Sequence, residues 1–302
     1  MNKILIALLL SCSILHSDDY FDNDFYYEDR SESTAAIEPA EEVKDPSLET
    51  EEKSPHSFKG SVSFVTDYRF RGISQTMRQP AVQGTLDYSH SCGFYLGTFG
   101  SNVDGTTNYY NNTSLELDFY SGFKGELFPK SIPNLTYNVG AILYYYPGGE
   151  SALAHPVRFN TAEFYVELGY EWINVRYWQT LTNYFGFCDR YTPFNWHDGD
   201  ADAPNGNSKG SNYIEANCNF EICPTWSTQL HIGRQTIRNY HHMNYVDWRA
   251  TISKEFDWFT LFCYYVGTNA NHNYYNVPDN EFNEKVRSLT AQGFVFGITR
   301  TL

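Results

Sequence analysis

The residues from Phe58 to Leu302 alternate between apolar and polar side chains over many short segments. A period of two places successive side chains on opposite faces of a β-strand. In the first segment, 58–70, one face carries Phe58, Val62, Phe64, Tyr68 and Phe70, and the other carries Lys59, Ser61, Ser63, Asp67 and Arg69. No segment with a convincing helical period interrupts the series, so the sequence predicts an all-β chain.

We expect twelve strands, and the spacing between them carries further information. The expected ranges are 58–70, 80–90, 92–102, 113–123, 135–146, 161–170, 172–183, 211–220, 226–235, 245–254, 258–268 and 289–302. Even-numbered strands are followed by shorter connections and odd-numbered strands mostly by longer ones. Short turns at one rim and long loops at the other are typical of a transmembrane antiparallel up-and-down β-barrel.

Charged residues in several expected strands are confined to one face. Glu116 and Asp118 alternate with Leu115 and Leu117, and the same sorting recurs in 161–170 and 245–254. A basic residue facing lipid at the bilayer midplane costs about 2–4 kcal/mol, and an acidic one less. The sorting therefore predicts a polar lumen. The predicted pore-lining residues are Asp67, Arg69, Arg71, Glu116, Asp118, Glu163, Glu167, Asp247 and Arg249.

Two functions fit such a lumen. Opposed acids and bases across a pore create a transverse field, which favours a passive channel for small hydrophilic solutes or ions. The same charges can instead form an ion-pair network that closes a structural or adhesive barrel whose outer loops bind partners. Twelve strands fall between the filled eight-stranded barrels and the wide sixteen-stranded ones, which favours a narrow channel. Because charges of both signs are present, the sequence leaves the sign of ion selectivity open. It also does not identify the solute or the oligomeric state.

Aromatic residues near the ends of the expected strands predict membrane girdles, where amphipathic rings lie at headgroup level. The predicted girdle residues are Tyr68, Tyr88, Phe119, Tyr170, Trp172, Trp248 and Trp258. The last strand ends on the apolar Leu302, like the insertion signal that the barrel-assembly machinery reads in outer-membrane proteins. The expected partners are thus outer-membrane lipids, this machinery and small polar solutes.

The N-terminal part divides into two segments ahead of a barrel at 58–302. Residues 1–17 resemble an export signal, with Lys3 before the apolar run Ile4–Leu10. A lipoprotein site at Cys12 is an alternative. Residues 18–57 are acidic and poor in apolar residues, which predicts a disordered periplasmic arm. Together these features predict a bacterial outer-membrane location.

The formal net charge is −15, and most of the acidity lies in residues 18–57. No basic stripe is present that could neutralise phosphates, which argues against nucleic acid.

The sequence predicts neither a cofactor nor an enzyme. Asp198, Asp200 and Asp202 offer clustered oxygens, but the glycine and glutamate of a calcium loop are missing, so we expect no metal. Ser227 and His231 share a strand face, which leaves an outer-membrane lipid hydrolase as a second alternative. Cys218 and Cys223 could form a disulfide after export, or serve as small hydrophobic residues.

The N-terminal part of the expected barrel also resembles a known family. The segments Val65–Gln75, Pro80–His90, Gly93–Asn102 and Leu115–Gly122 resemble the TorF porin family, which is also catalogued as a conserved proteobacterial family of unknown function. The resemblance covers about Phe58 to Gly125 closely and the remainder loosely. It implies an outer-membrane barrel with a channel role, and it implies no substrate and no catalytic residue.

Overall fold

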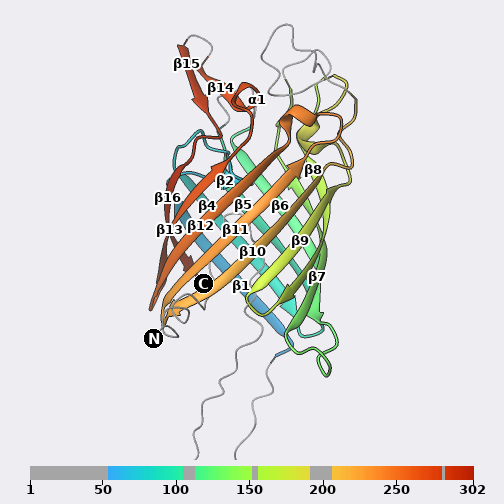
Figure 1. Ribbon diagram of the computed structural model, residues 1–302, viewed down its shortest axis with the longest axis vertical. Helices are drawn as coiled ribbons and strands as arrows, with labels where there is room; N and C mark the ends of the chain where they lie inside the picture. Colours follow the sequence, from blue (N-terminus) through green and yellow to red (C-terminus); the bar gives the residue numbers. More distant parts are fainter. Residues whose placement is uncertain (1–53, 105–112, 152–155, 191–205, 281–282) are drawn as a thin grey trace, which may run out of the picture.

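The computed structural model describes residues 54–104, 113–151, 156–190, 206–280 and 283–302. Twelve antiparallel strands form a closed barrel, as predicted (Figure 1). They are β1 (His56–Val65), β4 (Ala81–His90), β5 (Phe94–Asn102), β6 (Leu115–Glu126), β7 (Leu135–Tyr145), β8 (Thr161–Tyr170), β9 (Ile173–Thr180), β10 (Asn212–Cys223), β11 (Trp226–Thr236), β12 (Tyr245–Phe256), β13 (Phe259–Thr268) and β16 (Gly293–Thr301). The barrel closes where β1 pairs with β16, for example at Val62 and Arg300.

The connections define two different rims. Two-residue turns join β8 to β9, β10 to β11 and β12 to β13, and these lie at the rim where β1 begins and β16 ends. Apart from the β6–β7 connection at 127–134, which also lies at this rim, the longer connections lie at the opposite rim (Figure 1). We call these ends the turn rim and the loop rim. This is the arrangement that the spacing of the sequence predicted.

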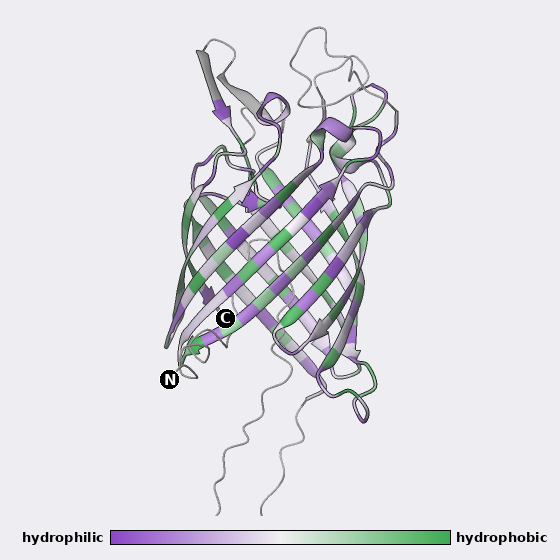
Figure 2. Cartoon of the chain, viewed as in Figure 1, coloured by the Kyte–Doolittle hydropathy of each residue, from purple (hydrophilic) through white to green (hydrophobic). Residues whose placement is uncertain are grey.

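The outer face of the barrel is apolar. Phe58, Leu86, Phe123, Ile232 and Phe296 are examples of large hydrophobic side chains that remain exposed. Figure 2 shows hydrophobic residues alternating with hydrophilic ones along the strands. A soluble protein rarely exposes so large a contiguous apolar surface. The outer face therefore suits a lipid environment, while most charged side chains of the strands lie on the inner face.

One segment departs from the predicted strand. β1 ends at Val65, not at residue 70, and residues 66–80 turn into the barrel as the inward segment. Two short strands, β2 (Arg69–Phe70) and β3 (Ile73–Ser74), form a hairpin in it. Arg71 and Gly72, at its apex, have φ angles of 46° and 79°. This left-handed conformation reverses the chain within two residues.

The inward segment changes the position of one predicted girdle residue. Tyr68 is only 1% exposed, and its hydroxyl donates a hydrogen bond of 3.0 Å to Glu116 of β6 inside the barrel. The prediction that Tyr68 lies in the outer girdle is therefore wrong. The alternation continued past Val65, but the chain had already left the barrel wall.

Large aromatic residues on the inner face pack against glycines of neighbouring strands. A Cβ atom added at Gly140 would overlap the Tyr165 ring, and one added at Gly233 would overlap the Tyr213 ring. Tyr95 and Phe99 of β5 also face inward. Glycines on the wall allow bulky rings to lie along it.

The remaining described elements lie at the loop rim. They are the short helical turns η1 (Tyr184–Gly186), η2 (His241–Met243) and α1 (His272–Tyr275), and the hairpin of β14 (Asn276–Asn280) and β15 (Asn283–Ser288). Within the described ranges, no helix is long and apolar enough to cross a membrane.

Three predictions concern residues outside the described ranges. They are the export signal at 1–17 with its alternative at Cys12, the acidic arm through residue 53, and the loop carrying Asp198, Asp200 and Asp202. At the end of the predicted arm, His56 and Ser57 already belong to β1.

Of the two alternatives for Cys218 and Cys223, the disulfide is not formed. The described cysteines, including Cys218 and Cys223, are free. β10 extends to Cys223, so the two residues lie on one strand instead of flanking a turn. Five residues of extended strand span about 16 Å, which is too far for a disulfide.

Candidate functional site

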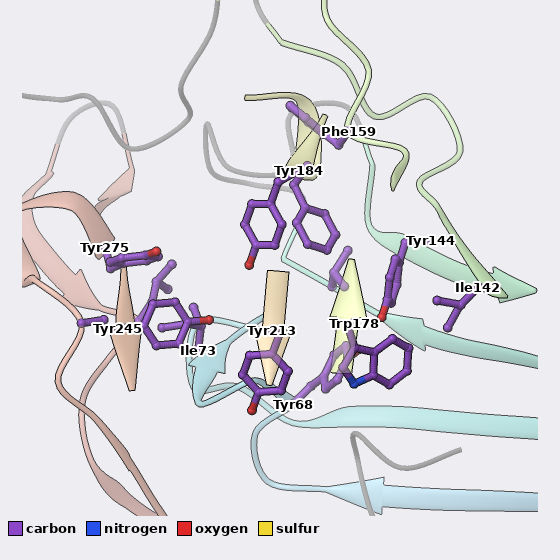
Figure 3. Close-up of a cluster of buried hydrophobic side chains, with 14 of the residues drawn as sticks. Tyr68, Ile73, Ile142, Tyr144, Phe159, Trp178, Tyr184, Tyr213, Tyr245 and Tyr275 are labelled. Atoms are coloured by element: carbon purple, nitrogen blue, oxygen red, sulfur yellow. The ribbon is translucent and has the colours of Figure 1, made fainter. Parts of the chain in front are cut away.

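The inward segment occupies the barrel interior near the loop rim. Tyr68 and Ile73 of this segment lie among side chains of the wall and the loops, including Tyr144, Trp178 and Tyr213 (Figure 3). All of them are almost fully buried. The interior at this level is therefore filled by side chains.

Arg71 connects the inward segment to the barrel wall. Its guanidinium forms an ion pair of 2.6 Å with Glu163 of β8 and donates a hydrogen bond of 3.0 Å to Gln235 of β11. The rings of Phe70 and Tyr213 lie 4.8 and 4.3 Å from the guanidinium carbon. A planar guanidinium suits this bidentate and stacked environment better than an ammonium group would.

Arg69 fixes the other side of the inward segment. Its Nε donates to Asp67 at 2.6 Å, and its terminal nitrogens donate to the carbonyl oxygens of Gly72, Leu289 and Ala291. Asp67 in turn accepts a hydrogen bond of 2.6 Å from Ser74. The segment thus has its own polar core and is attached to the chain just before β16.

A second charged cluster lies deeper on the wall. Arg176 of β9 pairs with Glu167 of β8 at 2.6 Å and approaches Glu215 of β10 at 4.0 Å. Trp178 donates a hydrogen bond of 2.7 Å to Glu215. These residues come from three adjacent strands, because inward positions at the same height face one another across the sheet.

His231 of β11 joins this cluster to the inward segment. Its Nε2 lies 3.0 Å from Asp247 of β12 and 3.0 Å from the Tyr213 hydroxyl, and its Nδ1 lies 2.7 Å from Asn217. A Cβ added at Gly72 would lie 2.7 Å from the Cβ of Asp247, so the hairpin apex rests against this residue.

All nine predicted pore-lining residues lie inside the barrel and are buried. Glu116, Asp118, Glu163, Glu167, Asp247 and Arg249 are on strands, whereas Asp67, Arg69 and Arg71 belong to the inward segment. Arg249 donates a hydrogen bond of 3.2 Å to Gln229. Their role in lining a pore stays a prediction.

The sequence interpretation missed four inward residues of the second cluster. Arg176, Trp178, Tyr213 and Glu215 alternate with the outward Val175, Tyr177 and Ile214, so the period of two already contained the signal. Trp178 and Tyr213 were missed because large aromatic residues were expected to face lipid.

Most of the predicted girdle residues face outward. Phe119, Tyr170, Trp172 and Trp258 are exposed, and Tyr88 and Trp248 are partly exposed. Tyr170, Trp172 and Trp258 lie at the turn rim, whereas Phe119 is the fifth residue of β6 and lies further along the wall.

The hydrolase alternative gains no geometric support. The ring nitrogens of His231 contact Asn217, Tyr213 and Asp247, and Ser227 is not among their hydrogen-bond partners. Within the described residues, no group of three or more His, Cys, Asp or Glu side chains is placed to hold a metal ion.

The closed antiparallel barrel with an apolar exterior and a charged interior has the architecture of outer-membrane porins. Residues 49–302 match the model of Gcw_chp, described as a bacterial protein of unknown function, and the chain belongs to this family. The similarity to TorF porins stays a resemblance. No curated protein matches the chain.

Several solved structures match this chain at very low sequence identity. The NanC porin is 9% identical with a TM-score of 0.46, and the match covers 82% of this chain and 100% of NanC. The COG4313 outer membrane channel from Pseudomonas putida F1 is 12% identical with a TM-score of 0.39, covering 86% and 100%. OccK5 from Pseudomonas aeruginosa is 10% identical with a TM-score of 0.37, covering 83% and 68%.

Proposed function

We propose that the protein is a porin-like channel of the bacterial outer membrane that passes small hydrophilic solutes or ions by diffusion. The observation that carries this proposal is the sorting of side chains on a closed barrel. Exposed apolar residues form the outer face, whereas the ionisable residues of the strands are largely confined to the inner face. A barrel that needed only to be stable in lipid would gain little from so many buried charges, because burying ion pairs seldom adds net stability.

The proposed orientation follows from the two rims. The turn rim, with both ends of the barrel, would face the periplasm, and the loop rim would face the outside. The apolar strand β16 would be the segment that the assembly machinery engages. Tyr170, Trp172 and Trp258 would lie at the periplasmic headgroup level.

The inward segment would set the size of the passage. Its apex crosses the interior, where Arg71 contacts β8 and β11. Arg71 and Glu163 would provide the transverse field of the constriction, and passage would require the segment to shift. We therefore expect a small single-channel conductance.

A second candidate function follows from the position of the inward segment inside the barrel. Because the interior near the loop rim is filled, the barrel could be closed, with its loops binding partners outside the cell. Removing residues 184–210 would then abolish surface binding and leave solute uptake unchanged.

Planar-bilayer recording of the refolded chain distinguishes the two functions. Discrete, reproducible current steps in 1 M KCl, on the order of those of other narrow barrels, would support the channel. Absence of any step over many insertions would contradict it and favour the closed barrel.

A further inference from the structure

The outer face of the barrel carries few charges, and they share one sign. On the twelve barrel strands, the outward positions occupied by Lys, Arg, Asp or Glu are Arg234 of β11, Lys254 of β12 and Arg300 of β16. All of them are basic. A base that faces lipid is costly at the bilayer midplane and tolerated near the headgroups, so the level of each base on the wall indicates what it contacts.

Lys254 and Arg300 lie near the turn rim on one side of the barrel. Each comes two positions after an exposed isoleucine, Ile252 or Ile298, so the alternation of the strand directs both bases outward. Their strands β12 and β16 are separated only by β13 (Figure 1).

The strand register places the two bases close to each other. Lys254 is paired with Leu261 of β13, and Leu261 is paired with Ile298 of β16. Neighbouring strands lie about 4.8 Å apart, so the backbones of Lys254 and Ile298 are about 10 Å apart. Arg300 is two residues closer to the rim. Long basic side chains extend along an apolar surface toward water, so both can reach one headgroup at this rim.

Aromatic rings hold both cations against the wall. The Lys254 ammonium lies 4.6 Å from the Trp226 ring and 5.3 Å from the Phe256 ring. The Arg300 guanidinium carbon lies 5.6 Å from the Trp258 ring, which is 64% exposed. A ring face attracts a cation without neutralising its charge. The two bases are therefore positioned and remain charged.

No acid compensates these charges on the outer face. Within the described part of the chain, neither Lys254 nor Arg300 forms an ion pair. The acids nearest in sequence to Lys254 are Glu255, at an inward position of β12, and Asp257, in the turn to β13. The charge of the two bases is therefore available to an anion outside the protein.

We infer that Lys254 and Arg300, with Trp226 and Trp258, bind the headgroup of an anionic phospholipid in the periplasmic leaflet. The inference rests on the proposed orientation of the barrel in the membrane and not on conduction. A guanidinium can donate two parallel hydrogen bonds to phosphate oxygens. No outward acid on these strands could pair with the ammonium group of a zwitterionic headgroup, so a net negative headgroup such as phosphatidylglycerol fits better.

Native mass spectrometry of the full chain tests the inference. The protein is released from micelles that contain equal amounts of phosphatidylglycerol and phosphatidylcholine, and the retained lipids are identified. We expect the unmodified protein to retain mainly phosphatidylglycerol. Lys254→Gln and Arg300→Gln should each weaken its binding about fivefold, because one basic contact with the anionic lipid is lost.

The matched control is Arg234→Gln, which removes the same charge from the same outer face near the loop rim. It should leave the lipid affinity unchanged. Trp258→Leu keeps both charges and should still weaken binding, because Arg300 loses the ring that positions it.

Three results would overturn the inference. They are equal retention of the two lipids by the unmodified protein, an equal loss of affinity in Arg234→Gln, and displacement of phosphatidylglycerol by inorganic phosphate, which would indicate a site for free anions.

The measurement requires a folded barrel and no current. Both bases lie on the outer surface, so we expect the variants to fold, and resistance of the folded band to SDS without boiling checks this. A barrel that binds phosphatidylglycerol through these residues but conducts no current would refute the channel alone. A conducting barrel without lipid preference would refute the lipid site alone.

Discussion

At the scale of single residues, the Arg71–Glu163 ion pair is the contact that most directly attaches the inward segment to the wall. Both side chains are buried, so Arg71→Met leaves the Glu163 carboxylate uncompensated. Removing one partner of a buried pair costs about 3–5 kcal/mol, whereas replacing both is often nearly neutral. We expect Arg71→Met to lower the urea midpoint of unfolding in detergent micelles and to increase the conductance.

The double variant and a surface arginine provide the controls for Arg71. Arg71→Met with Glu163→Met should recover much of the lost stability and keep the higher conductance. Arg234→Met, on the exposed side of β11, should change neither quantity. A stable Arg71→Met protein with unchanged current would show that the pair does not hold the segment in place.

The glycines beneath inward aromatic rings give a second prediction at this scale. A methyl group at Gly233 would overlap the Tyr213 ring and displace its hydroxyl from His231 and Asp247. Overpacking of this kind costs about 1–3 kcal/mol. We expect Gly233→Ala to lower the free energy of unfolding by that amount. Gly293→Ala, where nothing lies within 4 Å of the added atom, should have a much smaller effect.

At the scale of elements, the inward segment can be removed without disturbing the strands that it connects. Val65 of β1 and Ala81 of β4 are paired directly opposite each other, so a two-residue Asn-Gly turn can replace residues 66–80. We expect the shortened barrel to fold and to conduct several-fold more current, because the interior near the loop rim loses its largest obstruction.

Removal of residues 191–205 from another long connection serves as the matched control for the excision. It should leave the single-channel conductance close to that of the full chain. If the barrel without the inward segment conducts no better, the constriction lies elsewhere and the assignment of this segment is wrong.

At the scale of the whole molecule, contact with membrane lipid would explain why the outer face of the barrel is apolar. Leu230 lies near the middle of β11 and is 49% exposed, whereas Phe58 lies at the turn rim. In lipid vesicles, Leu230→Arg should lower the free energy of unfolding by about 2–4 kcal/mol, and Phe58→Arg by about 0–1 kcal/mol. Equal, small effects at both positions would indicate that the outer face does not contact lipid.

The sequence by itself determined the barrel, its twelve strands and the face on which the charged strand residues lie. This information is local: a period of two sorts side chains between lipid and the interior, and connection lengths define the two rims. Only the tertiary structure decided that residues 66–80 leave the wall and enter the barrel, because the alternation runs past Val65 without a break. The pairing of Arg71 with Glu163 and of Tyr68 with Glu116 joins residues 92 and 48 positions apart. Such contacts depend on the closed barrel bringing distant strands around one interior, which no local pattern records.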